Sequence, residues 1–250
     1  DIRDQSWVGL GHRFHVGTTD AIIHLASIAN DPAGDLDPKL TWEINVLATM
    51  HLAARAIKEG VGQFIYASSG SVYGTSYAPQ VTEETSLVPL SEYNKTKAVA
   101  ERVLLSYAGE MAIQIVRPAT VCGFSPRMRL DTIVNSITMQ ALTEGAITIR
   151  GGTQTRPNIH IEDMAECYLW LLARPELTGI YNAGFENMTV AEIARMVADR
   201  LNVGVSALPS NDPRSYRLDS ATLLKTGFRP KRTVADAVDL KGQGCAKVFG

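Results

Sequence analysis

The feature that most constrains this chain is the alternation of short apolar runs with longer amphipathic stretches over its first half. The runs Ala21–Ala26, Gln63–Ala67 and Ile113–Val116 have the length and composition of buried strands. Between them, apolar residues recur every three to four positions, which predicts a helix that ends at Gly60–Gly62 and another over Tyr93–Tyr107. Strands that alternate with helices of this length form a parallel sheet with right-handed crossovers. The predicted fold class is therefore α/β, with a doubly wound parallel sheet.

The second half of the chain has a different texture. A helix near Leu130–Thr143 is predicted, then a short strand at Ala146–Ile149 and a loop over Gly151–Pro157. Thr189 and Glu192 form a capping box that begins a further helix. A helix is also predicted over 161–172, and we expect its interior face to consist of Ala165, Tyr168, Leu169 and Leu172. We therefore expect one domain over residues 1–123, to which about 150–185 contribute, and a smaller α/β lobe mainly over 124–250.

Composition excludes several classes of function. The chain has 250 residues, with 24 Lys and Arg against 26 Asp and Glu, so no basic surface for nucleic acid or anionic lipid is predicted. No apolar run reaches the roughly 18–20 residues that cross a bilayer, and the polar start of the chain does not resemble a signal peptide. The three cysteines, Cys122, Cys167 and Cys245, form no Cys-x-x-Cys pair. We expect a cytoplasmic protein without a disulfide framework or a metal site, and no membrane or nucleic-acid partner.

Tyr93 and Lys97 are four residues apart on a predicted helix, so a phenol and an ammonium share one face. A nearby ammonium favours phenolate and lowers the pKa of a tyrosine from about 10. Such a tyrosine can take a proton from an alcohol while hydride leaves the same carbon. Taken alone, the pair fits a solvent-exposed helix face equally well.

The surrounding motifs favour the catalytic interpretation. The strand before this helix runs into Ser68-Ser69-Gly70-Ser71-Val72-Tyr73-Gly74, and the strand after it runs into Arg117-Pro118-Ala119-Thr120. With His24-Leu25-Ala26, Asn45-Val46 and the segment 156–163, these motifs resemble the extended short-chain dehydrogenase/reductase family, which includes the NAD-dependent nucleotide-sugar epimerases and dehydratases. They follow the family's order from Asp1 to about Pro230. The resemblance implies a Rossmann-type sheet with a C-terminal substrate lobe, and NAD as cofactor, with NADP also possible in the family.

The resemblance also implies roles for individual residues. Ser69 matches the hydroxyl that holds the reacting sugar oxygen, Tyr93 the general acid/base, and Lys97 the residue that tunes it and holds the nicotinamide ribose. Besides Tyr93 and Lys97, the matching cofactor positions are Asp1, Ile2, Leu25, Ala26, Ser27, Asn45, Ala67, Ser68 and Pro118. The matching substrate positions are Ser69, Ser71, Thr120, Arg156 and Arg214, since an arginine fork suits a sugar-linked phosphate.

Several of these residues also have a purely structural interpretation. Asn45 is a good candidate for a hydrogen-bonded core amide, and His24 and His160 for core histidines. Arg217 competes with Arg214 for the phosphate role. Cys122 lies beside the expected site, where a small buried thiol is favoured over a nucleophile.

The chain departs from the family at its start. Family members open with a strand and a Gly-x-x-Gly-x-x-Gly turn that binds the cofactor pyrophosphate at a helix N-terminus. No such motif occurs here, and Gly9-Leu10-Gly11 neither follows a strand nor opens an apolar helix. Asp1-Ile2-Arg3-Asp4 resembles the end of the family's third strand, so the first two βα units are absent from the sequence. We expect the natural polypeptide to contain them; a genuinely truncated form would bind the cofactor far more weakly.

A second departure concerns the reaction. Sugar 4,6-dehydratases of the family carry Thr-Asp-Glu where this chain has Ser69-Gly70-Ser71, and neither glycine nor serine supplies their acid/base pair. The sequence therefore favours an enzyme like a 4-epimerase. The resemblance to the family further implies a nucleotide-diphosphate sugar as substrate and a homodimer. The first alternative is an NAD(P)H-dependent reductase of 4-keto nucleotide sugars or another member of the dehydratase family. The second is a non-catalytic dinucleotide-binding protein.

Overall fold

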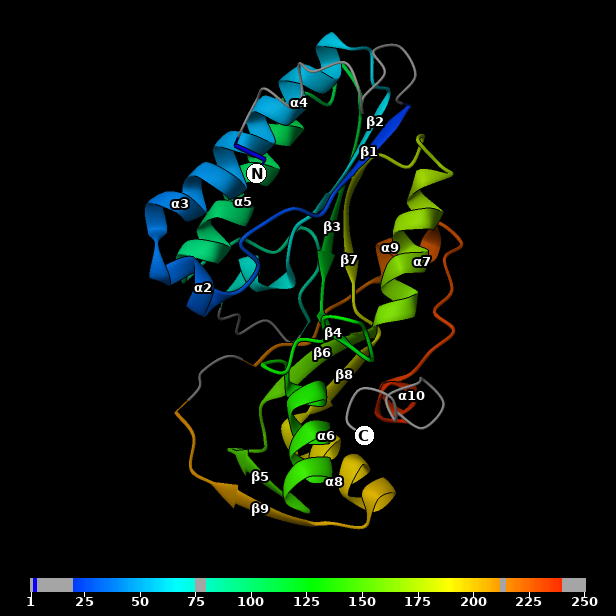
Figure 1. Cartoon of the computed structure of the whole chain (residues 1–250). Helices are drawn as coiled ribbons and strands as arrows, with labels where there is room; N and C mark the ends of the chain where they lie inside the picture. The colour runs from blue at the N-terminus through cyan, green and yellow to red at the C-terminus, as the bar shows by residue number, and fades with distance from the viewer. Residues whose placement is uncertain (1, 4–19, 75–79, 212–214, 240–250) are drawn as a thin grey trace. The chain divides into compact units, whose positions relative to one another are not determined.

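The computed structural model describes residues 2–3, 20–74, 80–211 and 215–239 (Figure 1). The chain divides into two compact units. Unit 1 consists of residues 1–74, 85–117 and 168–181, and unit 2 of residues 75–84, 118–167 and 182–250. Each unit contains a sheet and packed helices of its own.

The sheet of unit 1 has four strands in the order β1-β2-β3-β7, and β7 lies next to β3 although it comes much later in the sequence. The strands are β1 (Ala21–His24), β2 (Gln63–Ala67), β3 (Ala112–Pro118) and β7 (Gly179–Ala183). The pairs β1–β2 and β2–β3 are parallel, so their carboxyl ends meet at one edge. The predicted α/β fold with a parallel sheet is confirmed.

Helices cover both faces of this sheet. Figure 1 shows α4 (Ala48–Lys58) and α5 (Glu92–Leu105) along one face. Phe64 and Tyr66 point to that face and pack with alanine and leucine side chains of the two helices. Gln63, whose side chain points to the opposite face because strand side chains alternate, donates to the Leu171 carbonyl of α7 (Ile161–Leu172) at 2.9 Å.

Three short helical segments precede α4 in close succession. They are α2 (Asp31–Leu36), α3 (Pro38–Trp42) and the π-helical turn η1 (Glu43–Leu47). The end of α4 has a simple cause: Gly60 adopts a left-handed φ of 76°, and the Val61 N–H donates to the Ala56 carbonyl at 2.9 Å. This is a Schellman motif, which glycine permits without a Cβ clash.

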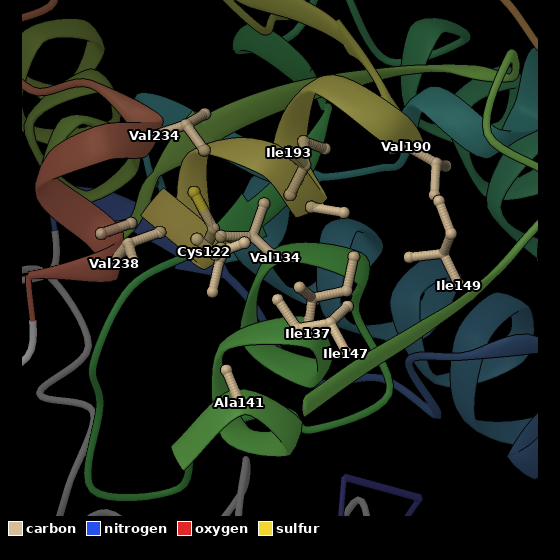
Figure 2. Packing of buried hydrophobic residues seen from close by; sticks show 14 residues of the cluster. Cys122, Val134, Ile137, Ala141, Ile147, Ile149, Val190, Ile193, Val234 and Val238 are labelled. Atoms are coloured by element: carbon tan, nitrogen blue, oxygen red, sulfur yellow. The ribbon is translucent and has the colours of Figure 1, made fainter. Parts of the chain in front are cut away.

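Unit 2 has two small sheets. One is β4 (Thr120–Cys122), β6 (Thr155–His160) and β8 (Glu186–Thr189), and the other pairs β5 (Ala146–Arg150) with β9 (Gly204–Leu208). Its helices include α6 (Ile133–Glu144), α8 (Val190–Leu201), α9 (Ala221–Lys225) and α10 (Val234–Val238). The capping box of Thr189 and Glu192 is present at the start of α8. Buried side chains of α6, α8, α10 and β5 form the core of this unit (Figure 2).

Three local predictions differ from the structure. The strand predicted over 21–26 ends at His24, and β6 begins at Thr155, inside the predicted loop 151–157. In α7 the buried side chains are Asp163, Met164, Cys167 and Leu171. Of the residues predicted to face inward, Ala165 and Leu169 are exposed, and Tyr168 and Leu172 are half-buried. This helix is apolar on nearly every side, so its periodicity does not select a face. None of the helices in the described ranges is long and apolar enough to span a bilayer.

Candidate active site

The end of β2 presents the first group of predicted site residues. The strand ends at Ala67, and Ser69 then caps the 3₁₀ turn η2 (Gly70–Tyr73) by accepting from the Ser71 N–H at 3.2 Å. The Ser69 and Ser71 hydroxyls are hydrogen-bonded to each other at 2.7 Å. Gly74 closes the turn with a φ of 63°, and a Cβ there would lie 1.9 Å from the Val88 oxygen, so only glycine fits.

Helix α5 supplies the second group. Ser91 caps it, Tyr93 is its second residue, and Lys97 lies one turn further. The Ser71 hydroxyl donates to the side-chain oxygen of Asn94, which ties η2 to the first turn of α5. Unit 1 therefore brings together Ser69, Ser71, Tyr93 and Lys97, as the sequence predicts for a catalytic site.

Lys97 is buried, with 3% of its surface exposed. Its ammonium donates to the Ala67 carbonyl at 2.8 Å and lies 5.9 Å from the centre of the Tyr93 ring. Burial lowers the pKa of Lys97 to about 7, although the Glu101 carboxylate acts in the opposite direction. Near neutral pH the ammonium is thus held close to the balance between its charged and neutral forms.

A buried polar network lies on the same helix, one turn beyond Lys97. The Glu101 carboxylate accepts from Arg117 Nε at 3.0 Å and from its Nη2 at 2.6 Å, and it also accepts from the Ser68 hydroxyl. Arg117 donates further to the Tyr73 hydroxyl at 2.7 Å. These four side chains are at most 4% exposed and join the end of β2, η2, α5 and β3. The Ser68 hydroxyl, predicted on the cofactor side, is therefore engaged inside the protein.

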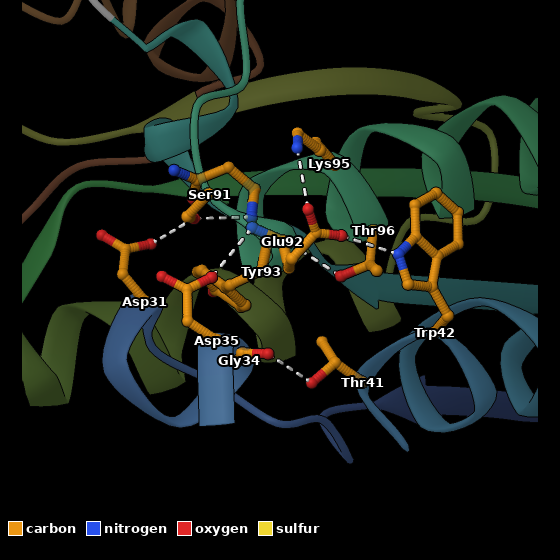
Figure 3. Close-up of polar contacts among 11 residues, drawn as sticks. Asp31, Gly34, Asp35, Thr41, Trp42, Ser91, Glu92, Tyr93, Lys95 and Thr96 are labelled. Carbon is orange, nitrogen blue, oxygen red and sulfur yellow. Dashed lines mark hydrogen bonds and ion pairs between the residues drawn. The ribbon is translucent and has the colours of Figure 1, made fainter. Parts of the chain in front are cut away.

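The first turn of α5 is also held from α2 (Figure 3). The Ser91 hydroxyl donates to Asp31 at 2.6 Å, and the Glu92 N–H donates to Asp35 at 3.3 Å. Gly34 of α2 faces Tyr93 so closely that a Cβ would lie 3.0 Å from the Tyr93 Cβ and 3.1 Å from its nitrogen. The position of the Tyr93 backbone thus depends on direct contact with α2.

Beyond the end of β1, the predicted cofactor positions differ in exposure. Leu25 is 57% exposed and Ala26 is exposed, whereas Ser27 is half-buried. The buried Asn45 accepts from the Ser27 hydroxyl at 3.1 Å and from the Ile28 N–H at 2.9 Å, and it donates to the Thr96 hydroxyl at 3.0 Å. Asn45 therefore has hydrogen-bond partners on both its oxygen and its nitrogen, and it connects this loop to α5.

The remaining predicted residues lie elsewhere. Ile2 is half-buried beside Arg3, which pairs with Glu43 at 3.1 Å. Pro118 ends β3 at the boundary of unit 1, while Thr120 and Arg156 belong to unit 2, on the neighbouring strands β4 and β6. Asp1 and Arg214 fall outside the described residues.

Three residues with an expected structural interpretation are buried. His24 is hydrogen-bonded to Thr49 at 2.9 Å, and burial, aided by Lys97, lowers its pKa to about 4. His160 accepts from the Glu162 N–H at 3.1 Å at the start of α7. Burial raises the pKa of Cys122 to about 12, so its thiol is no nucleophile at neutral pH.

Sequence reasoning missed Glu101, Tyr66 and Gly34. One signal for Glu101 was present, because Tyr93, Lys97 and Glu101 are spaced four residues apart on one helix and so share a face. Arg117 was noted as a candidate at the end of a strand, without an assigned role. Gly34 has no sequence signal, because its role depends on how closely α2 approaches Tyr93.

Part of this arrangement fits a dinucleotide. Within the described ranges the Ala67 carbonyl is the single hydrogen-bond acceptor of the Lys97 ammonium, so two of its three N–H donors are available for ribose hydroxyls. Tyr93 and Ser69 lie at the same carboxyl edge of the sheet, where ligands bind in folds of this kind. The glycine-rich turn that binds a pyrophosphate has no counterpart in the sequence. No group of three or more His, Cys, Asp or Glu in the described part could hold a metal ion.

The chain is similar to known proteins in sequence. A family model described as the NAD dependent epimerase/dehydratase family matches residues 1–184. The chain is 30% identical over 186 residues to an uncharacterized UDP-glucose epimerase, YtcB, of Bacillus subtilis, and this match covers 72% of the chain but only 58% of that relative. It is 27% identical over 246 residues to the mouse dTDP-D-glucose 4,6-dehydratase, a match that covers 92% of this chain and 68% of the relative.

The fold is similar to that of solved enzymes. The UDP-glucose 4-epimerase of Thermus thermophilus, solved in complex with NAD, superimposes with a TM-score of 0.82 at 25% identity, over 96% of this chain and 81% of that one. The resemblance drawn from the motifs and the Rossmann-type fold are thereby confirmed.

Proposed function

This chain belongs to the NAD-dependent epimerase/dehydratase family, and we propose that it epimerises a nucleotide-diphosphate sugar in the manner of a 4-epimerase. The observation that carries the proposal is the convergence of Ser69, Tyr93 and Lys97 in unit 1, next to a turn that holds no carboxylate. NAD supplies the chemistry of accepting a hydride from the sugar carbon and returning it.

The three side chains have distinct tasks in this proposal. The Tyr93 oxygen takes the proton of the sugar hydroxyl and later gives it back. The Lys97 ammonium, 5.9 Å from the Tyr93 ring, favours the phenolate form and offers its remaining N–H groups to the nicotinamide ribose. The Ser69 hydroxyl donates to Ser71 in the ligand-free protein, because the proton of Ser71 goes to Asn94; when the sugar binds, Ser69 turns this donor to the sugar oxygen and holds it near Tyr93. Inversion then requires only that the keto sugar turn before it is reduced again.

The η2 turn supports an epimerase over a dehydratase. Elimination of water needs an acid and a base beside Ser69, and the residues there are the buried Gly70 and the half-buried Ser71. Ser71 is engaged with Ser69 and Asn94. The similarity to a dehydratase therefore reflects shared fold and shared Tyr-Lys chemistry in this proposal, rather than the same reaction.

We assign the other predicted residues within the same proposal. Unit 1 binds the dinucleotide through Ile2, Leu25, Ala26, Ser27, Ala67 and Lys97, with Asn45 and Ser68 supporting these segments from inside. Unit 2 binds the nucleotide sugar through Thr120 and Arg156. A homodimer in the cytoplasm is expected for such an enzyme.

The test uses the protein expressed from its complete natural gene, with its intact mass measured first. UDP-glucose, UDP-galactose and UDP-glucuronic acid are each incubated with catalytic NAD, and the products are separated by chromatography. We expect interconversion of 4-epimers without net formation of NADH, and a loss of about 10²-fold or more in Tyr93→Phe with an unchanged circular dichroism spectrum. Unchanged activity in Tyr93→Phe would contradict the assignment.

The same assay separates the alternatives. A reductase of 4-keto nucleotide sugars would use the same three side chains but consume one NAD(P)H per product. A non-catalytic protein would bind NAD and convert none of the sugars. A decarboxylase would release CO₂ from UDP-glucuronic acid, which a coupled CO₂ assay detects.

A further inference from the structure

Two consecutive residues of β2 enclose the Lys97 ammonium. The Ala67 carbonyl accepts a hydrogen bond from Nζ at 2.8 Å, and the centre of the Tyr66 ring lies 4.8 Å from the same atom. A buried ammonium has lost its hydration, and few groups in a protein can replace the water. The face of an aromatic ring is one such group. The Tyr66 ring is therefore placed to stabilise the charge on Lys97.

Tyr66 interacts through its ring rather than through its hydroxyl. The side chain is fully buried, and its hydroxyl has no hydrogen-bond partner within the described part of the chain. The ring stacks with His24, with centroids 5.8 Å apart and planes at 27°, so neighbouring β1 helps to fix its orientation. The ring is therefore the part of Tyr66 that interacts with the Lys97 ammonium.

We propose that Tyr66 is a positioning residue, which holds the Lys97 ammonium against the face of its ring and keeps it charged beside Tyr93. The inference rests on the proposed function in one respect: the charge on Lys97 matters because Lys97 tunes Tyr93. The contact itself does not depend on the substrate.

The other charged and titratable groups around Lys97 do not replace the ring. His24, on β1, is neutral at physiological pH because burial and then Lys97 lower its pKa to about 4. Glu101, on α5, raises the pKa of Lys97, but its carboxylate is bound by Arg117 of β3 through two guanidinium nitrogens. Tyr93 presents its ring at 5.9 Å, further than that of Tyr66. On α4, the uncharged Thr49 is hydrogen-bonded to His24 at 2.9 Å.

The experiment weakens the ring face without changing its size. Phenylalanine and its mono-, di- and trifluorinated forms are incorporated at position 66, since each fluorine reduces the negative potential of the ring face. The pKa of Lys97 Nζ is followed by ¹⁵N NMR titration of the ligand-free protein, with the signal assigned by its loss in Lys97→Arg. We expect Tyr66→Phe to titrate like the wild type and the trifluorinated form to titrate about one pKa unit lower.

The outcomes are separable. A fall in the Lys97 pKa with each fluorine supports the proposal, and a flat series overturns it, because a ring that only fills space is insensitive to fluorination. Tyr66→Leu, which removes the ring, should lower the same pKa if the variant folds; the fluorinated series decides the matter if it does not. Absence of epimerase activity would overturn the proposed function, while this NMR titration would still report on Tyr66.

Discussion

The hydroxyl of Ser68 donates a hydrogen bond to the Glu101 carboxylate, so the end of β2 is tied to the middle of α5. This bond joins the two segments that carry the candidate catalytic groups. At one end of this bond, Ser68 lies between Ala67 and Ser69 in the chain. At the other end, Glu101 follows Lys97 by one helical turn. Because Arg117 neutralises Glu101 in a buried ion pair, the network adds no net charge beside Lys97.

Ser68→Ala tests this connection with a small change. The variant removes one buried hydrogen bond to a charged group, while Glu101 keeps Arg117, so we expect the free energy of unfolding to fall by about 1.5–3 kcal/mol. Urea denaturation measures the change. Ser106→Ala is the matched control, because that exposed hydroxyl bonds the Val103 carbonyl of its own helix at 2.7 Å, and it should alter stability by less than about 0.5 kcal/mol. An equal change in the free energy of unfolding for the two variants would show that the Ser68 hydrogen bond stabilises the protein no more than an exposed one does.

Gly34→Ala tests the contact between α2 and Tyr93. A Cβ at Gly34 would lie 3.0 Å from the Tyr93 Cβ, so either α2 or the first turn of α5 must shift. We expect a loss of about 1–3 kcal/mol in stability, and a loss of activity larger than that of equally destabilised variants elsewhere. Gly109→Ala is the control, since a Cβ there meets no atom within 4 Å. Wild-type activity in Gly34→Ala would show that α2 yields without displacing Tyr93.

The elements that carry the proposed catalytic residues were predictable, because each of these residues belongs to a local sequence pattern. Tyr93 and Lys97 lie on one helix, and Ser69 follows a strand, so spacing alone places each on its element. The parallel sheet followed from the alternation of strands and helices. Glu101 and Tyr66 could not be assigned a role in this way. The burial of the Glu101 carboxylate depends on its pairing with Arg117, which lies 16 positions away. In the sequence, Tyr66 cannot be distinguished from any other aromatic residue of the core.

Predictions failed where the pattern was ambiguous or the partner distant. In α7 apolar residues occur on almost every side, so the exposed Leu169 could not be separated from the buried Leu171. The strand β9 has five exposed residues and no alternating pattern, and it is a strand only because it pairs with β5, far away in sequence. Asn45 shows the same limit: either interpretation was open until its hydrogen bonds to the β1 loop and Thr96 were visible.

His24 should make stability sensitive to acid. Its folded pKa, lowered to about 4 by burial and Lys97, is below the unfolded value of about 6.5. The unfolded chain therefore binds a proton first, and stability present above about pH 6.5 is lost as pH falls toward 4, by roughly 3 kcal/mol. His24→Gln, which keeps a hydrogen-bonding group near Thr49, should lose less stability than the wild type between about pH 7 and pH 4.5. His51→Gln, at an exposed position, is the control for replacing a histidine by glutamine, and a wild-type slope in His24→Gln would refute the assignment.

Lys97 should make the free energy of unfolding depend on pH in the alkaline range, whereas His24 does so in the acidic range. Burial lowers its pKa to about 7 in the folded protein, against about 10.4 in the unfolded chain. Below about pH 7 Lys97 is protonated in both the folded and the unfolded state, and the folded protein bears the full penalty of a buried charge. Between about pH 7 and 10 Lys97 is charged only in the unfolded chain, so the free energy of unfolding rises with pH. Lys97→Met removes this dependence, and the difference in unfolding free energy between Lys97→Met and the wild type should shrink by roughly 4 kcal/mol from about pH 6.5 to pH 10.

The same titration bears on activity. If the charged ammonium tunes Tyr93, turnover should decline above about pH 7 in the wild type, while stability increases over that range. A lysine that folding leaves in water cannot give this combination, so Lys58→Met, at an exposed position at the end of α4, serves as the control and should follow the wild type in both measurements. If the difference in unfolding free energy between Lys97→Met and the wild type does not change with pH, Lys97 is charged over the whole range from about pH 6.5 to pH 10. Its burial then does not determine the pH range in which the enzyme is active.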